Sequence, residues 1–309
     1  MTYLYPMNKF AIWVQAARPR TLPLSLSGIV MGLALSPSSG FSNPWIMLGC
    51  LLTTVLFQVL SNFANDLGDG IKGTDNAQRI GPERAVQSGK ISVSSMKKAV
   101  VFMSFLSLLS AGLLLNAAVP NLTMKALIFY LILALLCVLA AITYTVGKKA
   151  YGYHGGGDLM VFLFFGGVAV LGTRHLFIPN FSVEEVLAAI AIGAWSTMVL
   201  NLNNLRDIDN DAEAQKKTIV VFLGLKNALR YHHILAILGS SCWVILVYRH
   251  SIETKNPLLL LALIPLLLFV KHTSQVMKIK EAKTFDPELK KVAMSTFLAS
   301  VLFFGLSHL

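Results

Sequence analysis

Charge-free apolar runs constrain this chain more than any other feature of its sequence. No Asp, Glu, Lys or Arg occurs among the 45 residues between Arg20 and Asp66. Seven further charge-free runs follow, at 99–124, 126–147, 159–173, 186–205, 231–248, 256–270 and 292–309. A transmembrane helix needs about 20 predominantly apolar residues, and backbone polar groups in lipid must be satisfied within the segment. The runs therefore predict an all-α integral membrane protein.

The composition excludes several other classes of protein. Only 13% of the 309 residues are charged and 55% are hydrophobic, whereas soluble domains average about 25% charged residues. An ordinary soluble enzyme, a disordered chain and a nucleic-acid-binding protein are excluded on this ground, in spite of the net charge of +11. The three cysteines lie in apolar runs without a CxxC pair, which disfavours a disulfide framework or a zinc site.

Nine membrane-spanning helices are predicted, because the run after Arg20 is long enough for two spans. The expected helices are 21–37, 44–65, 97–117, 123–145, 157–175, 185–205, 231–249, 256–271 and 292–308. The N-terminal segment and alternate loops hold 22 of the 26 Lys and Arg residues. Since basic residues favour the cytoplasmic side, we expect the N-terminus inside and the C-terminus outside.

We expect residues 1–309 to form one transmembrane domain around a single cavity that opens to the cytoplasm. Residues 1–20 mix basic, aromatic and proline residues, which is typical of a segment on the membrane surface rather than of a cleaved signal peptide. Residues 66–96 and 206–230 are predicted to be cytoplasmic loops that cap the cavity.

Eight of the fifteen carboxylates fall in two short windows that both lie on the predicted cytoplasmic side. The first window holds Asp66, Asp69, Asp75 and Glu83, and the second holds Asp207, Asp209, Asp211 and Glu213. Each window follows a pair of asparagines, namely Asn62 and Asn65, and Asn203 and Asn204. In a continuous helix, Asn62, Asp66 and Asp69 share one face, and so do Asn203, Asp207 and Asp211. The two windows form a weak internal repeat.

Carboxylates this close together favour a bound cation. Two of them about 5–6 Å apart on a helix face repel by roughly 3 kcal/mol at an effective dielectric constant near 20. Mg²⁺ is typically held by one or two carboxylates plus substrate phosphates. The predicted metal ligands are Asp66, Asp69, Asp207 and Asp211. The alternative interpretation is that the windows are solvated loop carboxylates.

Basic and amide side chains beside the windows are suited to a diphosphate, since cationic groups and N–H donors bind phosphate oxygens. The candidate diphosphate-binding residues are Asn62, Asn65, Lys72, Arg79, Arg84, Asn203, Asn204 and Arg206. The alternative for the basic residues is that they only set membrane orientation.

Two further elements are candidates for the site. Tyr144 and Lys148 are spaced i, i+4 at the cytoplasmic end of the predicted 123–145 helix, where Tyr144 would stabilise a cation and Lys148 would bind a departing diphosphate. The alternative is an interfacial tyrosine with a neighbouring lysine. Asp158 is either an N-terminal helix cap or a residue of the cavity.

Taken in order, Asn65-Asp66-x-x-Asp69, Tyr144-x-x-x-Lys148 and Asp207-x-x-x-Asp211 resemble the motifs of the UbiA superfamily of intramembrane prenyltransferases, over nearly the whole chain. The resemblance implies a polyprenyl diphosphate donor, Mg²⁺ as cofactor, and catalytic roles for Asp66, Asp69, Tyr144, Lys148, Asp207 and Asp211. Many members carry another Asp four residues after the first motif. Here Gly73 stands at that position, so Asp75 is an additional candidate metal ligand.

Within the superfamily, segments 61–75, 79–82, 141–147, 151–153, 157–158 and 202–208 resemble the branch that prenylates 1,4-dihydroxy-2-naphthoate. This implies transfer of the polyprenyl group with loss of CO₂, giving demethylmenaquinone in menaquinone biosynthesis at the bacterial cytoplasmic (inner) membrane. Two alternatives stay open on the sequence. One is another aromatic acceptor such as 4-hydroxybenzoate, and the other is a cation transporter that uses the acidic windows.

Overall fold

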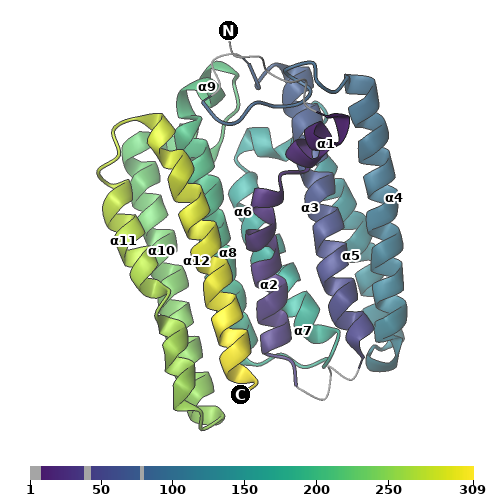
Figure 1. Cartoon of the computed structure of the whole chain (residues 1–309), viewed down its shortest axis with the longest axis vertical. Helices are drawn as coiled ribbons and strands as arrows, with labels where there is room; N and C mark the ends of the chain where they lie inside the picture. The colour runs from purple at the N-terminus through teal and green to yellow at the C-terminus, as the bar shows by residue number, and fades with distance from the viewer. Residues whose placement is uncertain (1–7, 38–42, 77–79) are drawn as a thin grey trace.

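The structure is a computed structural model that describes residues 8–37, 43–76 and 80–309. Within these ranges every regular element is a helix, and the long helices run roughly parallel or antiparallel in one bundle (Figure 1). The α-helices before residue 144 are α1 (Lys9–Ala17), α2 (Leu22–Ala34), α3 (Pro44–Lys72), α4 (Val93–Ala118) and α5 (Met124–Thr143). Those that follow are α6 (Gly157–Val161), α7 (Thr173–His175), α8 (Val183–Arg206), α9 (Ile208–Glu213), α10 (Ile219–Glu253), α11 (Leu266–Val276) and α12 (Phe285–Ser307).

Shorter or irregular helical elements complete the chain. A π-helix, η5 (Phe162–Gly172), continues α6 into α7. Short 3₁₀ segments are η1 (Pro19–Thr21), η3 (Val119–Asn121), η4 (Tyr151–His154), η6 (Pro257–Leu263) and η7 (Ala282–Thr284).

In the described part of the chain, eight helical segments are long and apolar enough to cross a membrane, by length and composition. The protein is therefore a multi-pass membrane protein. Each of the nine predicted segments contains a helix, but α2 has only 13 residues. Several predicted boundaries were wrong, because α3 continues to Lys72, α4 already begins at Val93, α10 begins at Ile219 and α12 begins at Phe285. The loop predicted at 66–96 therefore starts only after α3 and ends before α4. The loop predicted at 206–230 was also wrong in extent, because α9 and the first turns of α10 lie within it.

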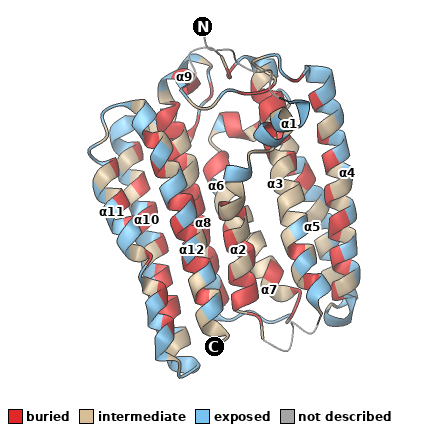
Figure 2. Cartoon of the chain, viewed as in Figure 1, coloured by how far each residue is buried: buried red, intermediate tan, exposed pale blue. Residues whose placement is uncertain are grey.

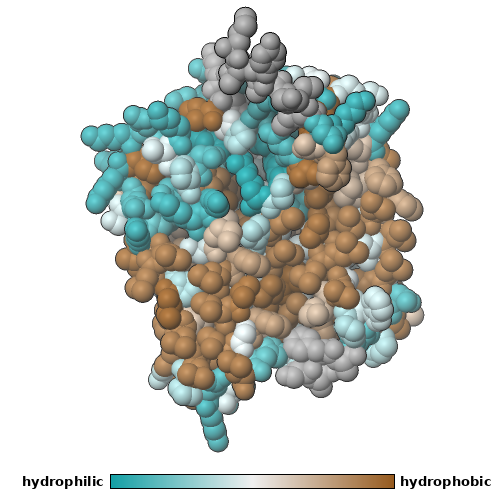
Figure 3. Space-filling view, in the orientation of Figure 1, coloured by the Kyte–Doolittle hydropathy of each residue, from teal (hydrophilic) through white to brown (hydrophobic). Residues whose placement is uncertain are grey.

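The outer surface of the bundle carries a broad apolar belt (Figure 3). Helices α4 and α5 contribute large exposed side chains to it, among them Phe102, Leu113 and Leu135. Hydrophilic residues gather beyond the belt, over the end that carries α9 (Figures 1 and 3). A continuous apolar surface of this extent suits contact with lipid chains, since soluble monomers rarely expose large apolar patches.

Helix α8 is the most deeply buried of the long helices (Figure 2). Its Trp195 is fully buried and stacks on Phe269 of α11 with ring centroids 4.4 Å apart. A chain of side-chain hydrogen bonds also ties α8 to its neighbours. Asn201 bonds His232 (3.0 Å), His232 bonds His272 (2.9 Å), and His272 bonds Glu288 (2.6 Å). These contacts fix α8 against α10, α11 and α12, so that the second acidic window is presented from a rigid support.

The first acidic window lies on α3, whose end packs closely against the turn after α5. A Cβ atom at Gly68 would lie only 2.4 Å from the hydroxyl oxygen of Thr145, so only glycine allows this approach. Gly73 then ends α3 with a φ of 72°, a left-handed conformation that glycine adopts without steric cost. The chain is thereby turned across the end of the bundle toward α9.

Candidate active site

A cavity of about 370 Å³ lies among α2, α3, α5 and η5. Most of its lining is aliphatic or aromatic, including Phe57, Leu133 and Phe164. Toward the end where α3 reaches Asp69, the lining includes Asn65 and Tyr144. The cavity is therefore an apolar chamber whose polar end adjoins the first acidic window.

The two acidic windows meet at one lysine beside this end. The Nζ atom of Lys216 lies 3.9 Å from Oδ2 of Asp69 and 3.7 Å from Oδ1 of Asp211. All three residues are buried. Burial alone would lower the pKa of Lys216, but the carboxylates of Asp69 and Asp211 raise it above its ordinary value. A charged ammonium group thus holds one carboxylate from each window around a single point.

Tyr153 of η4 forms one wall of the same site. Its hydroxyl donates a 2.7 Å hydrogen bond to Oδ1 of Asp69. The Nζ atoms of Lys72 and Lys216 lie 3.7 Å and 5.4 Å from the centre of its ring, within the range of cation–π contacts. Burial and the charge of Asp69 raise the pKa of the Tyr153 hydroxyl, which keeps it a hydrogen-bond donor at neutral pH.

Hydrogen bonds to backbone carbonyl groups also join the segments that carry the site. The Asn210 side chain donates a 2.9 Å hydrogen bond to the carbonyl of Thr74, across 136 residues. The N–H of Lys217 donates to the carbonyl of Tyr153 (3.1 Å). The end of α3, η4 and the α9 region are therefore locked together, although they are far apart in the sequence.

The other two predicted metal ligands have different partners. Asp66 accepts hydrogen bonds of 3.1 Å from the backbone N–H groups of Ala85 and Val86, so it anchors the loop after α3. Asp207 forms a two-pronged ion pair with Arg206, at 2.9 Å and 2.7 Å. Among the described residues, no three or more His, Cys, Asp or Glu side chains gather as a metal site. The structure thus brings Asp69 and Asp211 together and leaves Asp66 and Asp207 in separate pairs.

The predicted second helix face is interrupted at Asp207. Helix α8 ends at Arg206 and α9 begins at Ile208, with Asp207 between them at φ −100° and ψ 13°. In contrast, α3 continues through Asp69, so Asn62, Asp66 and Asp69 occupy successive turns of one helix as expected.

The remaining candidate diphosphate residues occupy varied positions. Arg84 pairs with Asp75 at 3.7 Å, and both are buried. Arg206 is buried, contacts Asp286 as well as Asp207, and donates a 2.9 Å hydrogen bond to Oδ1 of Asn203. Asn62 and Asn65 both line the cavity. The side chain of Asn62 also donates a 2.8 Å hydrogen bond to the carbonyl of Ala17. Asn204 is buried in α8, and Arg79 lies outside the described residues.

The expectation that the i, i+4 spacing of Tyr144 and Lys148 places them on one helix face was wrong. Helix α5 ends at Thr143, and Gly147 takes a φ of 97° in the turn that follows. Tyr144 lines the cavity while Lys148 is exposed. Burial raises the pKa of Tyr144 to about 12, so its hydroxyl stays neutral at physiological pH.

Asp158 does not cap a helix. The N-cap of α6 is Gly156, which makes no side-chain capping bond. Asp158 is 4% exposed, and its Oδ1 atom has no hydrogen-bond partner among the described residues. Its neighbour Gly157 lines the cavity, whereas the side chain of Asp158 hydrogen-bonds Tyr231 of α10 and is not among the described side chains that line the cavity.

Sequence reasoning missed Lys216 and Tyr153. Lys216 is one of the 22 basic residues that the sequence pattern assigns to the cytoplasmic side, and Tyr153 belongs to segment 151–153, which only the family resemblance singles out. The available signal for Lys216 was its place five residues after Asp211, since a lysine that follows an acidic window is a natural counter-ion. No local spacing could have paired Tyr153 with Asp69, because 84 residues separate them.

Comparison with known proteins gives a consistent result. The sequence pattern of the UbiA prenyltransferase family matches residues 25–289. The 1,4-dihydroxy-2-naphthoate octaprenyltransferase of Haemophilus influenzae is 42% identical, covering 96% of this chain and 95% of that protein. The enzyme of the same name from Escherichia coli is 41% identical, covering 96% and 95%.

A solved structure supports the fold. The UbiA homolog from Archaeoglobus fulgidus bound to GPP and Mg²⁺ superposes with a TM-score of 0.64 at 14% identity, covering 96% of this chain and 98% of that one. The helical bundle, the meeting of the two acidic windows and the sequence match lead to one conclusion: the chain belongs to the UbiA prenyltransferase family.

Proposed function

We propose that the protein transfers a polyprenyl group from polyprenyl diphosphate to 1,4-dihydroxy-2-naphthoate, with loss of CO₂ and diphosphate, to give demethylmenaquinone in its reduced form. The observation that carries the proposal is the convergence of Asp69 and Asp211 on Lys216 at the polar end of an apolar cavity. The two relatives that are 41–42% identical are named for this acceptor and for an octaprenyl donor, so octaprenyl diphosphate is the donor to test first.

The donor set at this point fits Mg²⁺ that arrives together with a diphosphate. Two carboxylates converge there, and Mg²⁺ is usually bound by one or two carboxylates plus substrate phosphates and water. Asp69 and Asp211 are the residues that would hold the ion, and Asp75, six residues after Asp69 and paired with Arg84, is a further carboxylate in the same segment. When bound, Mg²⁺ would neutralise charge that develops on the leaving diphosphate.

The other residues have roles that follow from their positions. Lys72 and Lys216 would bind diphosphate oxygens, since both ammonium groups lie beside the ring of Tyr153, which bonds Asp69. Lys148, exposed at the turn after α5, would assist from the surface, and Arg79 is a further candidate on the sequence pattern. Asp66 and Asp207 would act as positioning residues, through the loop at residues 85–86 and through Arg206 respectively.

The cavity itself would protect the reaction. Breaking the C–O bond of an allylic diphosphate leaves a carbocation that water would quench, and an apolar chamber excludes water. The ring of Tyr144 lines this chamber and would stabilise the cation by a cation–π contact. The ring carbon of the acceptor then forms the new C–C bond, and the carboxylate departs as CO₂.

The proposed topology has nine spans, with α2 as the short ninth, in the bacterial inner membrane. Helix α1 and α9 lie at one end of the bundle and the C-terminus at the other (Figure 1), which supports an odd number of crossings. The preponderance of basic residues near the α9 end supports a cytoplasmic position for the site.

The direct test uses purified protein in detergent with Mg²⁺, octaprenyl diphosphate and a panel of aromatic acids. We expect diphosphate release and a prenylated, decarboxylated product with 1,4-dihydroxy-2-naphthoate. Preferential prenylation of 4-hydroxybenzoate would overturn the acceptor assignment, and no diphosphate release with any acceptor would overturn the reaction.

A further inference from the structure

We propose that Gln58 and Ser61 of α3 bind the hydroxyl and carboxylate groups of the aromatic acceptor. This inference rests on the proposed function and assigns the part of the cavity that recognises the second substrate. Both residues line the cavity. They lie on the same helix face as Asn65 and Asp69, because residues three and four positions apart are neighbours on a helix surface.

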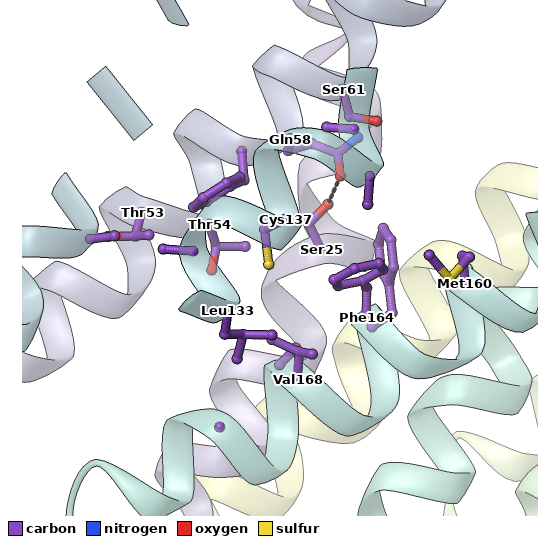
Figure 4. A pocket seen from close by; sticks show the side chains of 18 of the residues that line it. Ser25, Thr53, Thr54, Gln58, Ser61, Leu133, Cys137, Met160, Phe164 and Val168 are labelled. Carbon is purple, nitrogen blue, oxygen red and sulfur yellow. Dashed lines mark hydrogen bonds between the residues drawn. The ribbon is translucent and has the colours of Figure 1, made fainter. Parts of the chain in front are cut away.

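Gln58 is held in place from a second helix. The hydroxyl of Ser25, on α2, donates a 2.5 Å hydrogen bond to Oε1 of Gln58 (Figure 4). The Nε2 atom of Gln58 donates a 3.4 Å hydrogen bond to Oδ1 of Asn62. This bond uses one of the two N–H groups of the Gln58 amide. Ser25 is buried, so this contact fixes the amide against the cavity wall rather than leaving it free to rotate.

Polar groups without partners face the cavity at this point. Among the residues that the structure describes, the second N–H of Gln58 and the hydroxyl of Ser61 have no hydrogen-bond partner. Both side chains are half-buried at the cavity wall, so they are open to a ligand, and polar side chains inside membrane bundles usually serve a function. Two donors one turn apart therefore indicate a ligand that carries oxygen atoms.

The chemistry of the two substrates decides which one meets these donors. The isoprenoid tail has no hydrogen-bonding group, and the diphosphate belongs with the charged residues around Asp69. Gln58 and Ser61 lie 11 and 8 residues before Asp69, about 16 Å and 12 Å along the helix axis at 1.5 Å per residue. Only the acceptor carries oxygen atoms that must reach beyond the diphosphate into the chamber.

An aromatic side chain in the lining suits a planar ring. Phe164, from the π-helix η5, lines the same cavity as Gln58 and Ser61 (Figure 4). Aromatic rings pair favourably in offset-stacked or edge-to-face arrangements. A naphthalene ring placed against Phe164 would direct its oxygen substituents toward α3, where Gln58 and Ser61 donate.

The experiment compares Michaelis constants for the two substrates in three variants. We expect Gln58→Leu and Ser61→Ala each to raise the KM for 1,4-dihydroxy-2-naphthoate by about five- to tenfold, the effect of one lost hydrogen bond. The KM for octaprenyl diphosphate should stay unchanged. Thr54→Val is the matched control, because Thr54 lines the cavity one turn farther from Asp69, and both constants should then stay at wild-type values.

A fourth variant tests the charge of the bound group. Gln58→Glu keeps the size of the side chain and adds a negative charge, which would repel a bound carboxylate. The KM for 1,4-dihydroxy-2-naphthoate, which carries a carboxylate, should therefore rise more than the KM for naphthalene-1,4-diol, which carries none. An unchanged acceptor KM in both Gln58→Leu and Ser61→Ala, or an increase confined to the donor KM, overturns the inference. Failure of the wild-type protein to prenylate any aromatic acceptor would instead overturn the proposed function, so the two failures are distinguishable.

Discussion

Asp66 and Asp69 lie three residues apart on α3, yet their carboxylates bind different parts of the protein. Asp66 accepts from the backbone N–H groups of Ala85 and Val86. Asp69 accepts from the hydroxyl of Tyr153 and lies within 4 Å of Lys216. One carboxylate therefore organises the loop after α3, and the other lies in the site itself.

Asp69→Asn and Asp211→Asn should each lower kcat by about 100-fold or more, because each removes a charge that would bind the metal and the diphosphate. Diphosphate release with octaprenyl diphosphate and 1,4-dihydroxy-2-naphthoate measures the effect. Asp209→Asn is the control, since Asp209 is exposed on α9, and it should retain wild-type activity. Wild-type turnover in either Asp69→Asn or Asp211→Asn would contradict the site assignment.

Asp66→Asn should loosen the loop after α3 at Ala85 and Val86 rather than remove a reacting group. Hydrogen bonds to charged groups contribute about 1.5–3 kcal/mol each, and this variant weakens two of them. We expect faster hydrogen exchange at Ala85 and Val86 and a smaller loss of kcat than in Asp69→Asn. Unchanged exchange at both amides would show that the carboxylate does not hold the loop.

Lys216→Met should destabilise the protein, because it leaves Asp69 and Asp211 buried without their ammonium partner. Breaking a buried ion pair costs about 3–5 kcal/mol, which thermal unfolding would detect. Lys217→Met is the matched control, since Lys217 is the exposed neighbour. Because the two carboxylates raise the pKa of Lys216, its contribution is fully present below pH 10.5, the ordinary pKa, and the deficit should be the same at pH 6 and pH 9.

Mg²⁺ should bind weakly by itself and more tightly with a diphosphate, because the described residues supply two converging carboxylates and no larger cluster. A ligand that binds the folded state raises its apparent stability. Mg²⁺ plus inorganic pyrophosphate should therefore raise the Tm more than either alone, and Asp69→Asn should abolish the difference. Activity that survives complete removal of divalent metal by EDTA would rule out the metal-dependent mechanism.

Tyr144→Phe should change the alkaline stability profile. The folded-state pKa of Tyr144 is raised from 10.0 to about 12 by burial, so its contribution to stability is complete below pH 10 and is lost as the pH rises toward 12. The variant should show a shallower fall in Tm between pH 10 and pH 12 than the wild type. Identical slopes would mean that Tyr144 titrates normally in the folded protein.

Much of the fold could be predicted from local sequence. Charge-free runs of sufficient length predict helices in lipid, because no other regular structure satisfies the backbone there. The runs located a helix at each of the nine predicted segments. Boundaries were less certain, because the residues from Asp66 to Lys72 are polar and yet continue α3. Their helical state is supported by packing against the Thr145 turn and the loop at residues 85–86.

The site was only partly predictable. Motif spacing selected the acidic windows, and family resemblance gave them a chemistry that favours a prenyltransferase over a cation transporter. Spacing could not tell that Asp69 and Asp211 converge while Asp66 and Asp207 bind elsewhere. That division depends on which neighbour each carboxylate meets. Asp66 meets backbone N–H groups 19 and 20 residues away, and Asp69 meets Tyr153, 84 residues away.

The sequence by itself determined that the chain is a helical membrane protein with two acidic windows, because apolar run length and residue spacing are local properties. Only the tertiary structure decided that Lys216 and Tyr153 join those windows and that Gln58 and Ser61 face the cavity. Their positions follow from how helices from both halves of the chain pack around a single chamber. Such packing depends on the combined fit of many side chains, which no short stretch of sequence contains.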